Sequence, residues 1–137
     1  MARLISLDQA ETIVRACKAE AERLGQPMNI AVVDDGANLV TFCSMDGTKL
    51  IGVDIAQQKA RTAVYFHLDT KDVAPLVQPG QALFGIESTS GGRLAVFPGG
   101  VLLRDGSGAV VGGVGASAGT VEQDHAVAEA GRAAFTP

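Results

Sequence analysis

The residues best suited to holding a small molecule lie in a glycine-rich stretch that leads into the last predicted helix. Twelve of the seventeen glycines fall between Gly80 and Gly119, and Thr120 follows directly. Closely spaced glycines let backbone N–H groups face a ligand, and a helix that begins after them presents further N–H groups at its positive end. We therefore expect an anionic group of a ligand to bind at Ser117, Gly119 and Thr120.

The same stretch has two other interpretations. Thr120-x-x-Gln123 has the form of a capping box, so these residues can be no more than a well-formed helix start. Gly113-Val-Gly115-Ala-Ser-Ala118 superficially matches a dinucleotide-binding fingerprint. That fingerprint belongs to a βαβ unit, and no strand is expected after the last helix, so the sequence argues against dinucleotide binding.

Lys59 lies in a predicted helix of small apolar residues, about one turn from Ala56 and Ala63. We expect its ammonium group to cross the seam between helix and sheet and to pair with an anionic ligand, with Asp34 or with Asp124. The alternative is a surface lysine whose charged end reaches solvent.

Three carboxylates are candidates for general acid or base chemistry, because burial can give a carboxylate such a role. They are Asp34, Glu122 and Asp124. With Lys59 holding the substrate, they would make an enzyme that acts on a small oxygenated acid or carbonyl compound. Asp34 can equally support a turn.

The two histidines, His67 and His125, are candidates for cofactor binding. Glu122 and His125 have the spacing of a metal-binding pair on one helix face, but no further cysteine or histidine nearby completes a coordination shell. The sequence therefore predicts no metal-ion site. One or two imidazoles suffice as axial ligands of haem, which makes haem the possible cofactor. Ordinary histidines at the surface or at helix ends are the alternative.

Hydrophobic periodicity and turn residues predict the elements that position these side chains. A helix is expected between the capping box at Ser6 and the stop at Gly25, a second over about 50–66, and a third from Thr120. Strands are expected at 28–33, 39–45, 94–97, 101–104 and 109–115, and a long loop with one helical turn at 69–92. This order predicts an α+β fold, a single antiparallel sheet covered by helices.

Composition and charge limit the class of protein. The chain of 137 residues predicts one domain, 1–137. A net charge of −4 with scattered Lys and Arg argues against nucleic acid as a partner. The hydrophobic content of 47% lies in runs too short to span a bilayer, so no membrane partner is expected. The apolar surplus instead predicts a homo-oligomer.

The first residues lack the apolar core of a signal peptide, so a cytoplasmic location is expected. In keeping with that compartment, Cys17 and Cys43 are predicted to be buried free thiols rather than a disulfide.

Six segments of the chain together resemble one protein family. They are Ile30-Ala-Val-Val-Asp34, Met45-Asp-Gly47, Lys59-Ala-Arg-Thr-Ala63, Pro98-Gly-Gly-Val101, Gly112-Gly-Val-Gly-Ala-Ser117 and Glu122-Gln-Asp124. In this order they are similar to the GlcG/HbpS-like family, also called the haem-degrading domain family, with which the C-terminal domain of PduO-type proteins belongs. The resemblance implies a central antiparallel sheet flanked by helices, as in profilin or PAS-like domains, assembled into dimer-based, even-numbered oligomers. It also implies haem binding or degradation.

Two positions depart from the family pattern. Ser44 stands where the family usually has an arginine before Met-Asp-Gly, which removes a potential ion-pair partner. Ala118 stands where the family's Ser-Gly-Gly-Thr turn has a glycine, which narrows the turn.

The leading hypothesis is an oligomeric protein that binds a small organic or tetrapyrrole ligand between the glycine-rich strands and the start of the last helix. Lys59 would supply the counter-charge to the anionic group held at Ser117, Gly119 and Thr120. The other ligand-binding candidates are Gly99 and Gly100, with Phe97 and Val101 as apolar walls. The enzyme described above and a purely structural module are the alternatives.

Overall fold

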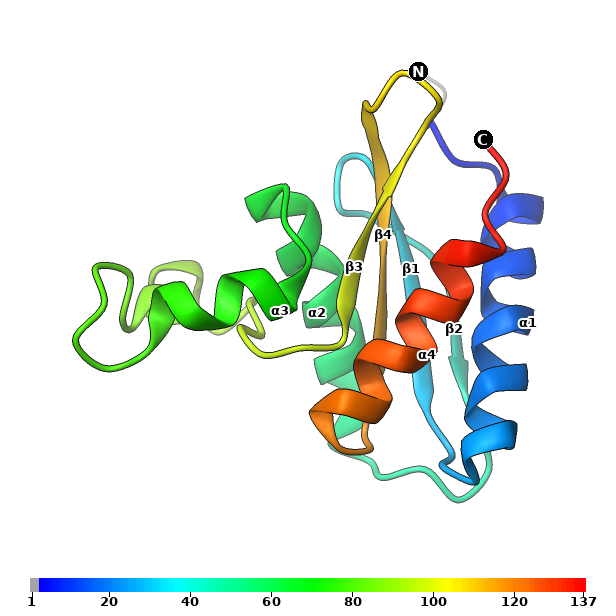
Figure 1. Ribbon diagram of the computed structural model, residues 1–137, viewed down its shortest axis with the longest axis horizontal. Helices are drawn as coiled ribbons and strands as arrows, with labels where there is room; N and C mark the ends of the chain where they lie inside the picture. Colours follow the sequence, from blue (N-terminus) through cyan, green and yellow to red (C-terminus); the bar gives the residue numbers. More distant parts are fainter. Residues whose placement is uncertain (1–2) are drawn as a thin grey trace.

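The computed structural model describes residues 3–137, which form an antiparallel sheet of four strands between helical layers (Figure 1). The strands, in the spatial order β2-β1-β4-β3, are β1 (Asn29–Asp34), β2 (Leu39–Ser44), β3 (Gly100–Arg104) and β4 (Val110–Ser117). The helices are α1 (Leu7–Leu24), α2 (Gly52–Phe66), α3 (Thr70–Val73) and α4 (Val121–Ala133), with 3-10 turns η1 (Ala74–Val77) and η2 (Ile86–Ser90). The expected α+β fold is confirmed. Among the described residues, the helices are too short or too polar to cross a membrane.

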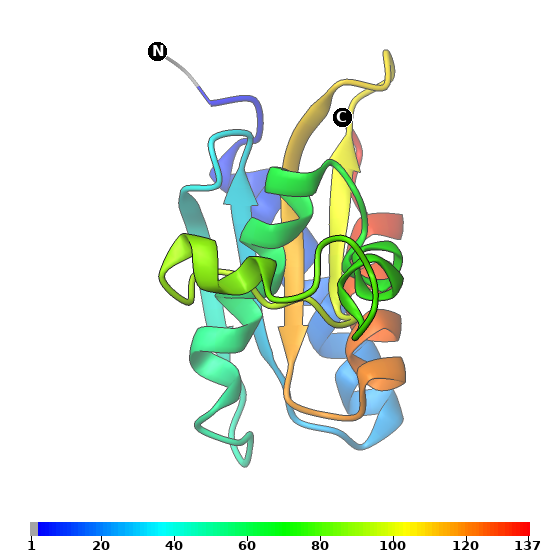
Figure 2. The ribbon, with the colours of Figure 1, turned by 90° about the vertical axis from the view of Figure 1, so that its left-hand side faces the viewer.

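Different helices cover the two faces of the sheet. α1 and α4 pack together on one face, and α2 covers the other (Figures 1 and 2). The predicted helix starts are confirmed, because both α1 and α4 begin with a complete capping box, at Ser6 and at Thr120. α1 ends at Gly25, whose left-handed backbone (φ 66°) lets its N–H bond the last carbonyls of the helix.

Glycines in β4 allow α2 to approach the sheet very closely. A Cβ atom at Gly113 would lie 2.7 Å from the carbonyl oxygen of Ala60, and one at Gly115 would collide with that of Ala56. The facing stripe of α2 is built from alanines, of which Ala56 and Ala60 are fully buried. These glycines therefore serve helix–sheet packing, which explains why residues that weaken strands are retained here.

The predicted strand at 94–97 is wrong, because this segment hydrogen-bonds to a helix instead of to the sheet. The Ala95 N–H donates to Thr62 Oγ1 at 3.0 Å, and Arg61 donates to the Arg93 carbonyl at 3.3 Å. Gln58 Nε2 similarly donates to the Gly92 carbonyl at 3.0 Å. Three side chains of α2 thus bind residues 92–95 against this helix.

Residues 70–92 form an arm that projects from the sheet and helices (Figure 1). The segment was predicted to be a loop with one helical turn, and the structure instead has three short helical segments, α3, η1 and η2. This arm exposes Leu76, Leu83 and Phe84.

Candidate functional site

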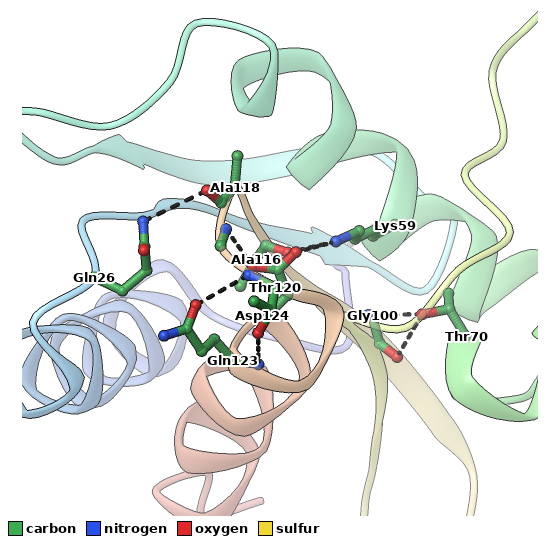
Figure 3. Close-up of polar contacts among 10 residues, drawn as sticks. Gln26, Lys59, Thr70, Gly100, Ala116, Ala118, Thr120, Gln123 and Asp124 are labelled. Carbon is green, nitrogen blue, oxygen red and sulfur yellow. Dashed lines mark hydrogen bonds and ion pairs between the residues drawn. The ribbon is translucent and has the colours of Figure 1, made fainter.

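The side chains of Lys59 and Asp124 meet in the seam between α2 and the start of α4 (Figure 3). Lys59 Nζ donates to Asp124 Oδ2 at 2.7 Å and to the Ala116 carbonyl at 3.0 Å. The Phe97 ring lies on the same ammonium group, 5.0 Å from Nζ to the ring centroid. Lys59 is 0% exposed and Asp124 is 2% exposed, so this charged pair is closed off from solvent.

Lys59 points inward because its helix face is otherwise apolar and because the glycines beside it have no side chains that would collide with it. A Cβ atom at Gly99 would lie 2.6 Å from Lys59 Nζ, and one at Gly100 would collide with the Lys59 carbonyl. Burial lowers the pKa of Lys59, and the attraction to the Asp124 carboxylate offsets only part of that effect. Neither side chain lines any of five hollows on the surface of residues 3–137. The pair is therefore built to hold α2 and α4 together.

The prediction that the amides at the start of α4 are free is wrong for three of them. The Gly119 N–H donates to Asp124 Oδ1 at 2.8 Å, and the Thr120 N–H donates to Gln123 Oε1 at 3.0 Å. The Gln123 N–H in turn donates to Thr120 Oγ1 at 3.1 Å (Figure 3). The capping box uses the N–H groups of Thr120 and Gln123, and the Asp124 carboxylate uses that of Gly119, so the three donors are not available to an anion at this turn.

Three other predicted ligand-binding residues, Val101, Ser117 and Phe97, do not line these five hollows. Val101 is fully buried in the core between the sheet and the layer of α1 and α4. Ser117 is 3% exposed at the end of β4, where it pairs with Asn29 of β1. Phe97 is 40% exposed on the outer side of Lys59.

The four candidate catalytic residues, three carboxylates and Lys59, do not converge. Asp34 lies opposite Gly112 in the sheet, at the other end of β1 from the Lys59–Asp124 pair. Its Oδ1 accepts from the N–H groups of Gly36 and Asn38, both at 2.9 Å, which is the turn-supporting role considered as its alternative. Glu122 is exposed on the first turn of α4. Only Lys59 and Asp124 come together.

His125 borders a hollow of about 290 Å³ beside the start of α4. The other lining residues are Lys71, Pro98, Val121 and Glu122. The imidazole is half-buried, and its Nδ1 atom is buried without a hydrogen-bond partner within residues 3–137. Desolvation lowers the pKa of His125, with a further contribution from the Lys71 charge. The imidazole is therefore neutral near pH 7, in the protonation state that can bind a metal ion or accept a hydrogen bond.

His67 lies elsewhere, in a second hollow of about 410 Å³. It ends α2 in a left-handed conformation (φ 52°), and its side chain is exposed. Arg132 also lines this hollow and is already engaged, since it donates to Asp69 Oδ1 at 2.8 Å and to the Glu129 carboxylate. The two histidines thus line different hollows, so they do not bind the same ligand within one chain.

Sequence reasoning missed Lys71 and Pro98 as lining residues of the His125 hollow. Lys71 lies in the irregular segment, where no periodicity indicated which way a side chain points. No local sequence signal identifies Lys71, because its position depends on a long-range hydrogen bond of Thr70, a residue inside the predicted loop. Thr70 Oγ1 accepts from the Gly100 N–H at 2.8 Å, which fixes Lys71 next to Pro98.

Comparison with known proteins places the chain in a family. A family model described as "Haem degrading protein HbpS-like" matches residues 5–133. The chain belongs to the HbpS-like family. The resemblance to the GlcG/HbpS-like family expected from the six segments is thereby confirmed.

Three relatives show how far the similarity extends. An uncharacterized 15.0 kDa protein encoded between dhaT and dhaS in Citrobacter freundii is 38% identical over 91% of this chain and 87% of its own length. The crystal structure of Klebsiella pneumoniae ORFY superposes with a TM-score of 0.94 at 32% identity, covering 98% of this chain and 92% of that one. A crystal structure of a PduOC:heme complex superposes with a TM-score of 0.91 at 32% identity, covering 97% of this chain and 99% of that one.

Proposed function

We propose that this protein binds haem or another tetrapyrrole, with His125 as the iron ligand. The observation that carries the proposal is the half-buried His125 imidazole, which borders a hollow and is neutral near pH 7 because desolvation lowers its pKa. The PduOC:heme complex, a close structural relative, supports the same ligand class.

The residues around His125 fit a haem iron in charge and polarity. Pro98 and Val121 give the hollow apolar walls, and the lowered pKa keeps the imidazole neutral and able to donate its lone pair. Haem iron held by an imidazole supplies one-electron redox chemistry and an intense Soret absorption. A volume of about 290 Å³ is at the lower end for ligand sites, so a tetrapyrrole would extend beyond the hollow.

A titration with hemin, followed at the Soret band, tests this proposal. The wild-type chain and the His67→Ala variant should both shift the Soret band of hemin, whereas His125→Ala should lose the shift. His67→Ala is the matched control, because His67 is the other histidine and lines a different hollow. An unchanged Soret shift in His125→Ala would show that the iron ligand is another residue.

The protein is further proposed to be a dimer-based, even-numbered homo-oligomer. Support comes from large apolar side chains left exposed on the single chain, of which Leu50 is 85%, Ile51 64% and Phe84 64% exposed. Light scattering should give an even multiple of 14.0 kDa. A monomeric mass across a wide concentration range would contradict this assembly.

The cytoplasm is the proposed compartment. Both cysteines are free thiols, and burial raises the pKa of Cys17 to about 12, which makes it unreactive. Fractionation of the native host, with this protein detected by antibody, tests the location.

A further inference from the structure

Lys71 occupies a rigid position at the rim of the His125 hollow. It is the second residue of α3, and the two residues before it are both bound to the edge strand β3. Thr70 Oγ1 accepts from the Gly100 N–H at 2.8 Å, as Figure 3 shows, and Asp69 Oδ1 accepts from the Leu102 N–H at 3.0 Å. The backbone that carries Lys71 is therefore anchored to the sheet, even though it belongs to the base of the projecting arm.

The Lys71 ammonium group is free to bind an anion. Its side chain is exposed, and it forms no ion pair with another residue in the described part of the chain. Lys71 and His125 line the same hollow, and the nearby positive charge contributes to the lowered pKa of His125. Glu122 is the one opposing charge among the residues that line this hollow.

These features together describe a site for an amphiphilic acid. Pro98 and Val121 offer apolar contact, His125 offers a neutral imidazole, and Lys71 adds a positive charge at the rim. We infer that Lys71 binds a carboxylate of the ligand, so that the hollow selects tetrapyrroles with free acid side chains over their neutral esters. This inference rests on the proposed function, because it assigns a role to a residue of the same site.

The direct test compares hemin with hemin dimethyl ester, which keeps the iron and the macrocycle but lacks the negative charges. Wild-type protein should bind hemin about three- to fivefold more tightly than the ester, the ratio expected for one partly exposed ion pair. Lys71→Met, which keeps the apolar stem, should lose this preference. Glu122→Gln should increase the preference, since it removes the opposing charge. Added salt should weaken the preference in the wild type.

Lys18→Met is the matched control, because Lys18 is a lysine that lines another hollow together with Cys43. It should keep the wild-type preference for hemin. Far-UV circular dichroism of each variant confirms folding. Equal binding of hemin and its ester by the wild type, or an unchanged preference in Lys71→Met, overturns the role of Lys71 alone. No Soret shift with either compound overturns the haem proposal and this inference with it.

Discussion

Lys59 and Asp124 lie 65 positions apart in the sequence and form a buried ion pair that joins α2 to α4. The carboxylate uses both oxygens, one for Lys59 Nζ at 2.7 Å and one for the Gly119 N–H at 2.8 Å. The pair thereby fixes the first turn of α4 against α2. Because His125 follows Asp124 directly, the same contact also sets the position of the proposed iron ligand.

Removal of one partner of this pair should strongly destabilise the fold. Lys59→Met leaves the Asp124 carboxylate buried without its counter-charge, which typically costs about 3–5 kcal/mol of unfolding free energy. The double variant Lys59→Met with Asp124→Asn should recover much of that loss, because no buried charge then remains unpaired. Urea unfolding measures both.

The exposed pair Arg23–Glu20 on α1 provides the control. Its removal by Arg23→Gln should leave the unfolding midpoint unchanged, because solvent screens the pair. If Lys59→Met had as little effect as Arg23→Gln, the buried pair would not be a structural tie.

Gly100 should be intolerant of even a methyl group. Its Cβ would collide with the Lys59 carbonyl oxygen and would lie 2.9 Å from the Thr70 methyl carbon. Because the first obstacle is backbone, Gly100→Ala should cost about 1–3 kcal/mol or more of unfolding free energy. Gly106→Ala is the control, since a Cβ there meets nothing within 4 Å. Similar unfolding curves for the two variants would contradict the close approach of α2.

Local signals in the sequence predicted much of the fold. Both capping boxes, at Ser6 and Thr120, consist of residues three positions apart, so they can be recognised without knowing the tertiary structure. The segment 94–97 could not be predicted in this way. It has the composition of a strand, but the Ala95 N–H donates to Oγ1 of Thr62, a residue distant in sequence, instead of to a neighbouring strand.

The candidate site was predictable only in part for the same reason. The sequence named both Asp34 and Asp124 as partners for Lys59, and sheet register separates the two. Asp34 pairs with Gly112 at one end of β1, while Ser117, near Asp124, pairs at the other. The glycines were noticed correctly but given the wrong role, because glycine composition alone does not distinguish room for a ligand from room for a helix.

Asp69 should contribute stability that disappears in acid. Burial acts to raise its pKa, but hydrogen bonds from Arg132 and from the Leu102 N–H outweigh burial and hold the pKa below its ordinary value of 3.8. A carboxyl with a lowered folded pKa stabilises the protein above the unfolded pKa, and this stability is lost as pH falls through the folded pKa. Asp69→Asn should therefore cost about 1–2 kcal/mol at neutral pH and little at low pH.

Asp72→Asn is the control for this measurement, because Asp72 is exposed on the same short helix α3. Denaturant unfolding at several pH values should show a difference from wild type that shrinks with acid for Asp69→Asn alone. A difference that stays constant with pH would mean that Asp69 acts through packing and not through its charge.

His125 should make the protein less stable as pH falls below neutrality. Desolvation and the nearby charge of Lys71 lower its pKa below the ordinary 6.5, while Glu129 and Asp69 act against the shift and Arg132 adds to it. A histidine that is harder to protonate in the folded state gives full stability above the unfolded pKa. That stability is lost as pH falls through the folded pKa, because the unfolded chain binds the proton more readily.

NMR titration of the two histidines checks this prediction directly, with His67→Gln used to assign the signals. The His125 signal should titrate below pH 6.5 in the wild type. In Lys71→Met its pKa should rise, since removal of a nearby positive charge favours the imidazolium. Desolvation, the larger cause, remains in that variant, so the rise should be partial. A His125 pKa at or above 6.5 in the wild type would contradict the desolvation of the imidazole in the folded protein.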